Sequence, residues 1–434
     1  MVAQNNRFIS VREFQPIFAA TVIDGVEVTK QDIEALRLEL EQPQSDVMPF
    51  LKPIRNGVQV MNYVGVLQTQ SGLTIEILPK LYNQSGEAGD KKELRQLFLT
   101  MLKTVRRLNG KTFNMTHLDV SKTNLLEVFI SMFLSESDAV IKRGLKSDYV
   151  NVERNEKFLK GKLLVTQHIR KNNINQAYFY NAFDEYLIDI IENQLLKTTL
   201  EFLLKKSKDA RNNRLIKEQL VHLNCVSTVS NPEQAFQKVK LGRTYGHYTQ
   251  ALEWCQLFLS GKSLTSFRGS TQAFAILFPM EKLFESYVAT LVTQYLPEAT
   301  VSSQDKAYAL FDKTAETKAS YHLRPDLVVR YKDKAQGTII ADTKWKILNE
   351  KGPSQADAYQ MYAYHTRYCH KGEHVKKVVL IYPYTTAYQP NEFRSLIGES
   401  TELGARIQVR FIDLFSDNMA EQIIEMFNLN ESLN

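Results

Sequence analysis

The sequence YHLRPDLVVRYKDKAQGTIIADTKWK, from Tyr321 to Lys346, contains two runs rich in β-branched and apolar residues. The first run spans Leu323–Tyr331 and the second spans Thr338–Lys346, and charged residues together with Gly337 separate them. This pattern predicts two neighbouring strands that form a hairpin. The hairpin would bring the RPD segment and the DTK segment onto adjacent strands.

Three charged side chains of this hairpin are predicted to converge. Asp326 and Asp342 lie on adjacent strands, and Lys344 shares a strand face with Asp342 because side chains alternate with a period of two. Two carboxylates and one ammonium group in one place are typical of an active centre, in which we expect Asp342 to be exposed. In the simpler alternative, Asp326 is a turn residue and the other two form a surface ion pair.

The predicted acidic pair indicates a divalent cation. Two carboxylates at hydrogen-bonding distance repel each other unless a positive charge lies between them. Oxygen ligands favour Mg²⁺ or Mn²⁺ over zinc. Such an ion would activate water and offset negative charge on a phosphate, and Lys344 could orient the water or stabilise the developing charge.

Predicted helices flank the hairpin and carry further polar side chains. The upstream helix contains Glu281 and Glu285 one turn apart, in the segment PMEKLFESYV. The downstream helix, Ser354–Tyr364, contains Gln360 and Tyr364, which share a face because they are four residues apart. Either glutamate could face the acidic pair.

This order of elements, completed by a predicted strand over Val375–Tyr382, resembles the PD-(D/E)xK nuclease superfamily and its branch with a QxxxY helix. More narrowly, the segments FPMEKLFESYV, RPDLVV, ADTKWK, QMYAY and LIYP resemble the McrC family, the nuclease subunits of McrBC-type 5-methylcytosine restriction systems. The resemblance is densest over about Phe274–Pro383. It is fainter in LTIEILPKLY (Leu73–Tyr82) and LKGKLLVTQHIRK (Leu159–Lys171).

The resemblance implies an α/β nuclease fold with a central mixed sheet, and a Mg²⁺-dependent or Mn²⁺-dependent endodeoxyribonuclease that hydrolyses a DNA phosphodiester. Asp326 and Asp342 would hold the metal, with the Thr343 carbonyl as a third ligand. Lys344 would orient or activate water.

The flanking helices would complete the catalytic set. Glu285 would reach the metal through water, and Glu281 is an equal candidate from its spacing. Gln360 and Tyr364 would position Lys344 or the DNA strand.

A partner is also implied. Members of the McrC family join McrB, an AAA+ GTPase ring that recognises and translocates modified DNA. The chain has no nucleotide-binding signature, since Gly242–Gly246 is not a GxxxxGK[ST] loop. Two alternatives stay open: an autonomous RecB-like repair or recombination nuclease, and a DNA-binding adaptor without activity.

The N-terminal part, about residues 1–115, is predicted to be α/β and, by the resemblance, to dock onto the partner. The expected strands are Phe8–Phe14, Ile17–Ile23, Val58–Gln68 and Leu73–Leu78. A helix is expected after the capping-box pair Thr29 and Asp32, and another over Lys91–Arg107. A proline-rich exposed loop is expected over Pro43–Pro53.

The middle part, about residues 116–270, is predicted to be mainly helical, with helices over Asn124–Lys142, Ala177–Lys206 and His247–Leu259. Residues 142–171 contain nine Lys or Arg against three Asp or Glu. Such a run is either a solvated face or a surface that contacts phosphates. In a nuclease we expect DNA contact, through Lys160, Lys162, Arg170 and Lys171.

Composition agrees with these assignments. A chain of 434 residues with 44% hydrophobic and 24% charged residues is typical of a multi-domain globular protein, and residues 271–434 would form the nuclease domain. The net charge of +6 is compatible with nucleic acid. Three widely spaced cysteines indicate unpaired thiols in a reducing compartment, and no signal peptide or membrane span is apparent. We expect a cytoplasmic protein.

Overall fold

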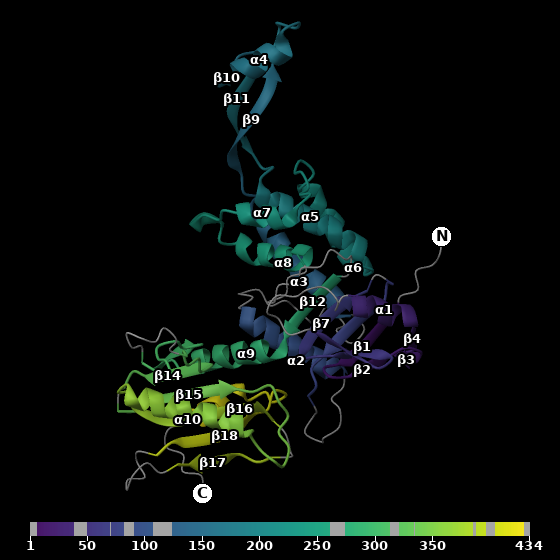
Figure 1. The fold of residues 1–434 in the computed structure, drawn as a ribbon. Helices are drawn as coiled ribbons and strands as arrows, with labels where there is room; N and C mark the ends of the chain where they lie inside the picture. The colour runs from purple at the N-terminus through teal and green to yellow at the C-terminus, as the bar shows by residue number, and fades with distance from the viewer. Residues whose placement is uncertain are drawn as a thin grey trace. The chain divides into compact units, whose positions relative to one another are not determined.

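The computed structural model describes residues 7–38, 50–69, 71–81, 91–106, 124–260, 274–312, 321–333, 335–384, 388–395 and 404–428 (Figure 1). The chain forms two compact units. The first unit comprises Met1–Gly110, Thr271–Ala273 and Leu277–Asn434, and the second comprises Lys111–Ser270 and Phe274–Ile276. The predicted division into three domains, at residues 115 and 270, stays a prediction.

The first unit opens with small β-sheets. Its main sheet has the order β1-β8-β7-β12 and contains β1 (Phe8–Arg12), β8 (Thr74–Leu78), β7 (Tyr63–Gln68) and β12 (Phe274–Pro279). The ribbons beside it are formed by β2 (Pro16–Phe18), β6 (Gly57–Val60) and β5 (Leu51–Ile54), and by β3 (Thr21–Ile23) and β4 (Val26–Val28). Strands β7 and β8 pair antiparallel, so the predicted strand Leu73–Leu78 lies beside the end of the predicted strand Val58–Gln68.

Two segments that were predicted as single strands are each divided between two strands. The segment Ile17–Ile23 is divided between β2 and β3 because Ala20 has a positive φ of 61°, which an extended strand cannot contain. The segment Val58–Gln68 is divided between β6 and β7. Of the expected proline-rich loop, residues 43–49 lie outside the described residues, and Pro53 belongs to β5.

A buried ion pair allows a carboxylate inside the main sheet. All five residues of β8 are buried, including Glu76. Arg95 of α2 (Lys91–Arg106) donates to both carboxylate oxygens of Glu76, at 2.9 and 2.7 Å, and the Ser10 hydroxyl donates at 2.9 Å. The helix therefore covers this strand with a salt bridge as well as with its apolar face.

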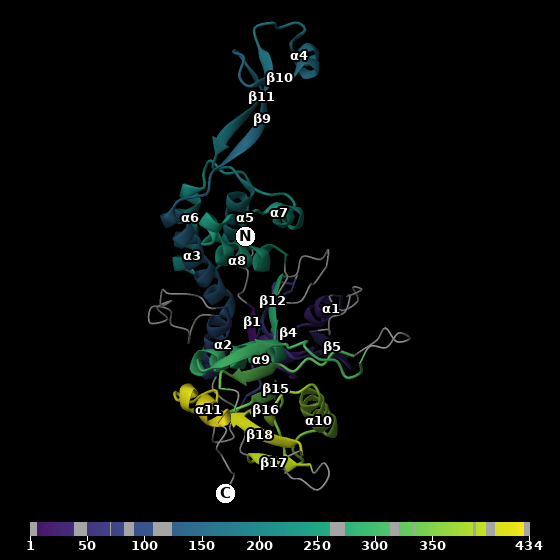
Figure 2. The same cartoon turned by 90° about the vertical axis from the view of Figure 1, so that its left-hand side faces the viewer.

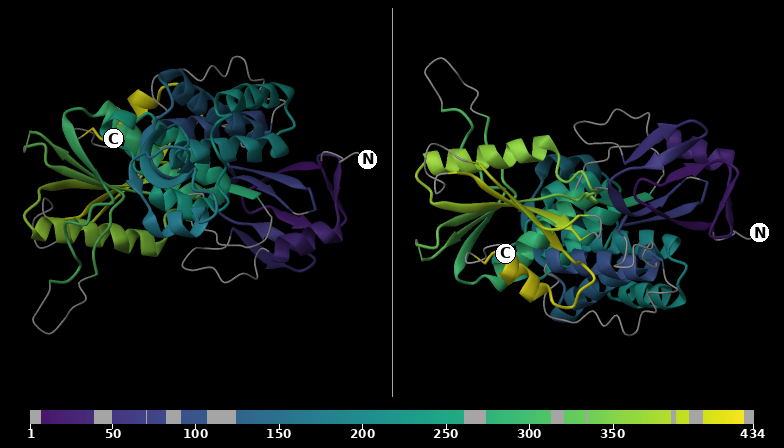
Figure 3. Two further views of the ribbon diagram at one scale, coloured as in Figure 1. Left: turned by 90° about the horizontal axis from the view of Figure 1, so that it is seen from above. Right: turned by 90° about the horizontal axis from the view of Figure 1, so that it is seen from below.

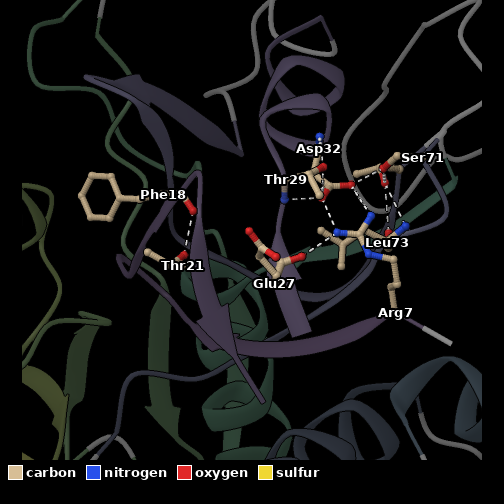
Figure 4. A network of polar contacts seen from close by, with 9 residues as sticks. Arg7, Phe18, Thr21, Glu27, Thr29, Asp32, Ser71 and Leu73 are labelled. Atoms are coloured by element: carbon tan, nitrogen blue, oxygen red, sulfur yellow. Dashed lines mark hydrogen bonds and ion pairs between the residues drawn. The ribbon is translucent and has the colours of Figure 1, made fainter. Parts of the chain in front are cut away.

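Helix α1 (Lys30–Leu38) begins with the predicted capping box (Figure 4). The Asp32 backbone N–H donates to the Thr29 hydroxyl at 3.2 Å, and the Thr29 N–H donates to Asp32 Oδ2 at 2.7 Å. Arg7 and the Ser71 hydroxyl donate to the same carboxylate. Burial alone would raise the pKa of Asp32, but these hydrogen bonds lower it to about 2.

The remainder of the first unit is built on a six-stranded mixed sheet with the order β13-β14-β15-β16-β18-β17. Its strands are β13 (Ala299–Ser303), β14 (Leu327–Tyr331), β15 (Thr338–Thr343), β16 (Val375–Pro383), β18 (Arg406–Ile412) and β17 (Asn391–Arg394). Helix α10 (Gln355–His370) packs along one side, and α11 (Met419–Met426) lies on the other, where it contacts α9 (Met280–Tyr295) (Figures 2 and 3). The predicted α/β fold is confirmed.

The core of this sheet explains its sequence pattern. Strands β15 and β16 are buried over nearly their whole length, and their central residues, Ile339–Ala341 and Val378–Ile381, are accordingly continuous apolar runs rather than alternating ones. On the side of α10, Val328, Ile340 and Val378 pack against Met361 and Tyr368. The even-numbered residues of β15 thus face α10, and Asp342 is one of them.

Trp345 links the six-stranded sheet to the N-terminal sheet. Its indole Nε1–H donates to the Glu13 carboxylate, at 3.1 Å to Oε2 and 3.3 Å to Oε1. Its carbonyl accepts a hydrogen bond from Lys80 Nζ at 3.2 Å. Burial raises the pKa of Glu13 to about 7, even though Lys80 and the indole favour the ionised form.

Glu13 should make stability depend on pH. The folded pKa of about 7 lies above the ordinary 4.5, so the contribution of Glu13 to stability is fully present below about pH 4.5 and is lost as the pH rises from there through 7. The full difference corresponds to roughly 3 kcal/mol. Glu13→Gln should therefore flatten the pH dependence of the unfolding free energy, measured by denaturant titration from about pH 5 to about pH 8.

Three charged groups set the environment of that titration: Lys80 beside Glu13, Glu281 on α9, and Lys346, which faces Lys80. The matched control is Glu34→Gln, because Glu34 is an exposed carboxylate on α1. An unchanged pH dependence in Glu13→Gln would show that Glu13 keeps its ordinary pKa.

The second unit combines helices with a β-ribbon. Its helices are α3 (Leu125–Arg143), α5 (Ile191–Lys206), α6 (Ala210–His222), α7 (Pro232–Lys238) and α8 (Tyr248–Ser260). Strands β9 (Asp148–Glu156) and β11 (Phe179–Leu187) extend away from these helices as an antiparallel ribbon, which carries β10 (Lys162–Leu163) and α4 (Val165–Asn172) (Figures 1 and 2).

The ribbon corrects one prediction. The segment Ala177–Lys206 was expected to form one long helix, but only Ile191–Lys206 is helical and Phe179–Leu187 is β11. The FYNAFDEYL segment pairs with β9 over its whole length, and its aromatic residues suit a strand. Long-range pairing has overridden the helical spacing of the apolar residues.

Within the described ranges, no helix combines the length and apolar character needed to cross a bilayer. The three cysteines, Cys225, Cys255 and Cys369, are unpaired, as predicted.

Candidate active site

The predicted hairpin is present in the six-stranded sheet. Strands β14 and β15 pair antiparallel with Leu327 opposite Ala341, which places Asp326 next to Asp342 at the end of the pair. Asp326 immediately precedes β14 and Lys344 immediately follows β15, so both lie just outside the strands that were expected to contain them. All three charged residues therefore lie at the same edge of the sheet.

The three predicted side chains meet. Lys344 Nζ lies 2.5 Å from Asp342 Oδ2. Asp326 accepts hydrogen bonds at Oδ2 from the backbone N–H and the hydroxyl of Thr343, both at 2.8 Å. Thr343 therefore fixes the orientation of the Asp326 carboxylate, and its predicted role as a carbonyl ligand stays a prediction.

Asp342 is buried, with 2% of its surface exposed, so the expectation of an exposed carboxylate is wrong. It is buried because β15 is a central strand covered by α10. Burial, together with the neighbouring Asp326, raises the pKa of Asp342 to about 7 against the opposing effect of Lys344. Burial also raises the pKa of Asp326. The two acids thus resist being ionised together.

The QxxxY residues form a chain of hydrogen bonds to the lysine. Lys344 Nζ donates to Gln360 Oε1 at 3.0 Å, and Gln360 Nε2 donates to the Tyr364 hydroxyl at 2.7 Å. Tyr364 is buried, and burial raises the pKa of its hydroxyl. The amide of Gln360 is held from both ends, and it can therefore hold the ammonium group in one place.

Asp357 is a member of this cluster that sequence analysis missed. Its Oδ1 lies 3.7 Å from Lys344 Nζ, and its Oδ2 accepts a hydrogen bond from the Ser354 hydroxyl at 2.7 Å. The signal was available, because Asp357 precedes Gln360 by three residues and shares its helix face. Although burial lowers the pKa of Lys344, the carboxylates of Asp342, Asp357 and Asp326 raise it overall, so it stays charged.

Of the two candidate glutamates, Glu285 lies on the side of the acidic pair. Gln304 Nε2 donates to Glu285 Oε1 at 2.6 Å and to Asp326 Oδ1 at 3.1 Å, and so bridges the two carboxylates. Burial and Asp326 raise the pKa of Glu285. Glu281 lies instead within the electrostatic reach of Glu13 and Lys80. No sequence signal identified Gln304, which follows an unpredicted edge strand.

The site has the donors that a hard cation requires. Asp342 Oδ2 is buried and accepts no hydrogen bond of standard geometry, although Lys344 lies beside it. Among the described residues, no three His, Cys, Asp or Glu side chains are grouped to hold a metal by themselves. Two carboxylates, a backbone carbonyl and water would be the ligands, a set that Mg²⁺ prefers because it retains several waters. The residues fit such an ion.

The four predicted DNA-contacting residues lie together on the β-ribbon of the second unit. Lys160, Lys162, Arg170 and Lys171 are all exposed. Gly161 has a φ of +67°, and a Cβ there would lie 2.5 Å from the Ala182 carbonyl oxygen, so the turn requires glycine.

Two of these lysines lie over aromatic rings. The Nζ atoms of Lys160 and Lys171 lie 3.9 and 4.2 Å from the ring centres of Phe183 and Tyr180.

The family of the chain is shown by its sequence. A family model described as "McrBC 5-methylcytosine restriction system component" matches residues 58–383. The chain belongs to the McrBC family. The resemblance predicted from the motifs is thereby confirmed, and the match covers the candidate site together with the β-ribbon of the second unit.

Solved structures share the fold of this McrBC-family chain. A structure of Thermococcus gammatolerans McrB AAA+ hexamers with bound McrC contains a chain that is 20% identical, with a TM-score of 0.68 over 97% of this chain and 99% of that chain. A cryo-EM structure of the Thermococcus gammatolerans McrBC complex is 22% identical over 67% of this chain and 88% of that chain, with a TM-score of 0.50. No curated protein matches the chain.

Proposed function

We propose that this McrBC-family chain is the DNA-cutting subunit of a modification-dependent restriction system and that it hydrolyses phosphodiesters with Mg²⁺ or Mn²⁺. The observation that carries the proposal is the convergence of Asp326, Asp342 and Lys344 at the end of β14 and β15. These positions match the PD-(D/E)xK pattern, because the proline–aspartate pair directly precedes β14 and the DxK triplet lies at the end of the antiparallel neighbour β15.

Each residue of the site would have a separate role in the reaction. Asp326, oriented by Thr343, and Asp342 would hold the cation, which supplies a nucleophilic water at neutral pH and offsets charge on the phosphate. Lys344 would stabilise negative charge that develops on the phosphate or hold the water in line. Gln360 would keep the ammonium group in position.

The partner follows from the family. The solved relatives are described as McrC bound to McrB AAA+ hexamers and as a McrBC complex. This chain would likewise join an AAA+ GTPase ring, and the ring would recognise and translocate modified DNA. The absence of a nucleotide-binding signature from the sequence supports this division of labour.

One experiment tests the proposal. Purified chain is mixed with methylated or unmethylated DNA, Mg²⁺, and the AAA+ GTPase encoded beside it with GTP. Cutting of methylated DNA that requires both the partner and the metal is the expected result. Cutting without the partner would instead indicate a RecB-like autonomous nuclease. A complete mixture that cuts neither DNA would indicate an adaptor without activity.

The basic surface of the β-ribbon should contribute to DNA affinity. The double variant Lys160→Gln/Lys162→Gln removes two exposed charges, and each phosphate contact contributes about 0.9 to the slope of log K against log salt. We expect a weaker complex and a slope reduced by up to about 1.8, measured by fluorescence anisotropy.

The control for this pair is Lys217→Gln, since Lys217 is exposed on α6 in the same unit. An unchanged slope in the double variant would indicate that both lysines are ordinary solvated side chains that contact no phosphate.

A further inference from the structure

Trp345 is held on three sides. Its indole N–H donates to Glu13, its carbonyl accepts from Lys80, and its ring packs against Phe284 with 5.3 Å between ring centres. It is 2% exposed. It follows Lys344 directly in the sequence, and Phe284 directly precedes Glu285. Its position is therefore tied to two members of the candidate site.

Glu13 and Lys80 form a compact clamp at the end of the N-terminal sheet. The Glu13 N–H donates to the Leu78 carbonyl at 3.0 Å, and the Lys80 N–H donates to Glu13 Oε2 at 3.1 Å. Lys80 Nζ lies 4.4 Å from the centre of the Phe14 ring. Phe14 has a positive φ of 63°, a conformation that costs free energy and persists where the surroundings require it.

The backbone of Lys344 needs such support. Strand β15 ends at Thr343, and the last ladder hydrogen bond runs from the Lys344 N–H to the Ile381 carbonyl at 2.8 Å. Beyond that bond, the sheet no longer restrains the chain, and the next residue is Trp345. Glu13 and Lys80 thus hold the chain at Trp345, just beyond the last hydrogen bond of the sheet.

We propose that Trp345 is a positioning residue for Lys344, and that Glu13 and Lys80 of the N-terminal sheet hold it in place. The segments ILPKLY and ADTKWK, which lie far apart in the sequence, therefore meet to form one support. The N-terminal sheet would thereby set the geometry of the nuclease site. This inference rests on the proposed function, because it concerns the position of the proposed catalytic lysine.

The test compares single-turnover cutting by the full chain with its partner, Mg²⁺ and methylated DNA. Glu13→Ala and Trp345→Phe each remove the hydrogen bond to the indole nitrogen, and Trp345→Phe keeps a ring against Phe284. Because small displacements of a reacting group slow chemistry strongly, we expect the rate constant to fall about tenfold or more with an unchanged KM for DNA.

Two further variants separate positioning from general damage. Glu13→Gln keeps an acceptor for the indole N–H, so it should cut within about twofold of wild type. The double variant Glu13→Ala/Trp345→Phe should be no slower than the slower single variant, because both remove one interaction. Lys91→Ala is the control, since Lys91 forms an exposed ion pair with Asp24 elsewhere in this unit.

The hydrogen bond itself can be observed without any cutting. The chain has two tryptophans, so Trp254→Phe leaves Trp345 as the only source of an indole N–H resonance. That resonance should move upfield in Glu13→Ala and change little in Glu13→Gln. If Glu13→Ala does not fold, the cutting rates of Trp345→Phe and Glu13→Gln still test the positioning role, with a loss expected only in Trp345→Phe.

The experiments distinguish a failure of the positioning role from a failure of the proposed function. Wild-type rate constants in Glu13→Ala and Trp345→Phe, or additive losses in the double variant, would overturn the positioning role and leave the nuclease intact. A wild-type protein that cuts nothing would overturn the proposed function, even if the indole resonance responds to Glu13 as expected.

Discussion

Asp342→Asn is expected to reduce DNA cutting by at least about 10³-fold and to leave the fold intact, because it removes one of the two carboxylates that would hold the metal. The substitution keeps the shape of a buried side chain, so it creates no cavity. Burial and Asp326 raise the pKa of Asp342 to about 7. Above that pH the folded protein contains an ionised, buried Asp342, which lowers its stability, and the asparagine variant avoids this cost. The variant should therefore melt no lower than wild type at about pH 8.

The measurement combines cutting with metal binding. Mn²⁺ affinity, followed by isothermal titration calorimetry, should fall together with the cutting rate in Asp342→Asn. Asp333→Asn is the matched control, since Asp333 is an exposed aspartate on the same hairpin. Cutting by Asp342→Asn at the wild-type rate would show that the acidic pair is not the metal site.

Lys344→Met is expected to lose cutting by at least about 10²-fold while retaining metal binding. Methionine has a similar length but no charge, so the site loses the ammonium group that lies 2.5 Å from Asp342 and donates to Gln360 at 3.0 Å. Asp342 is then left buried without its cationic neighbour, and it can take up a proton or a metal ion instead. Mn²⁺ affinity should be unchanged or higher than in wild type.

This pattern separates Lys344 from Asp342. A loss of Mn²⁺ affinity in Lys344→Met would mean that the lysine supports the metal site rather than the chemistry. Lys351→Met is the control, because Lys351 is an exposed lysine only seven residues further along the chain. It should cut at close to the wild-type rate.

Short sequence patterns were sufficient to predict which side chains meet at the centre of the candidate site. The hairpin is two apolar runs around a glycine turn, and strand alternation predicts a shared face for Asp342 and Lys344, which meet although Lys344 lies one residue beyond β15. Gln360 and Tyr364 share a helix face for an equally local reason. The two shared faces depend on residues two and four positions apart, and the hairpin depends on two short runs joined by one turn, so local backbone conformation sets the geometry in each case.

Other features depend on contacts between distant segments. Glu281 and Glu285 are equivalent by helical spacing, and only the packing of α9 brings Glu285 toward Asp326 through Gln304. The segment Phe179–Leu187 has apolar residues at helical spacing, yet it is a strand because its conformation comes from pairing with β9.

By itself, the sequence determined the hairpin that brings Asp326 beside Asp342 and the side chains that share a face with Lys344 or Gln360, because these follow from periodicity and turn chemistry over short stretches. The α/β nuclease fold was implied by the family resemblance. Only the tertiary structure decided that Asp342 is buried, that Gln304 and Asp357 join the site, and that Glu13 reaches Trp345. The physical reason is distance along the chain: burial and hydrogen bonding between remote segments depend on how the layers pack, and no local pattern encodes that packing.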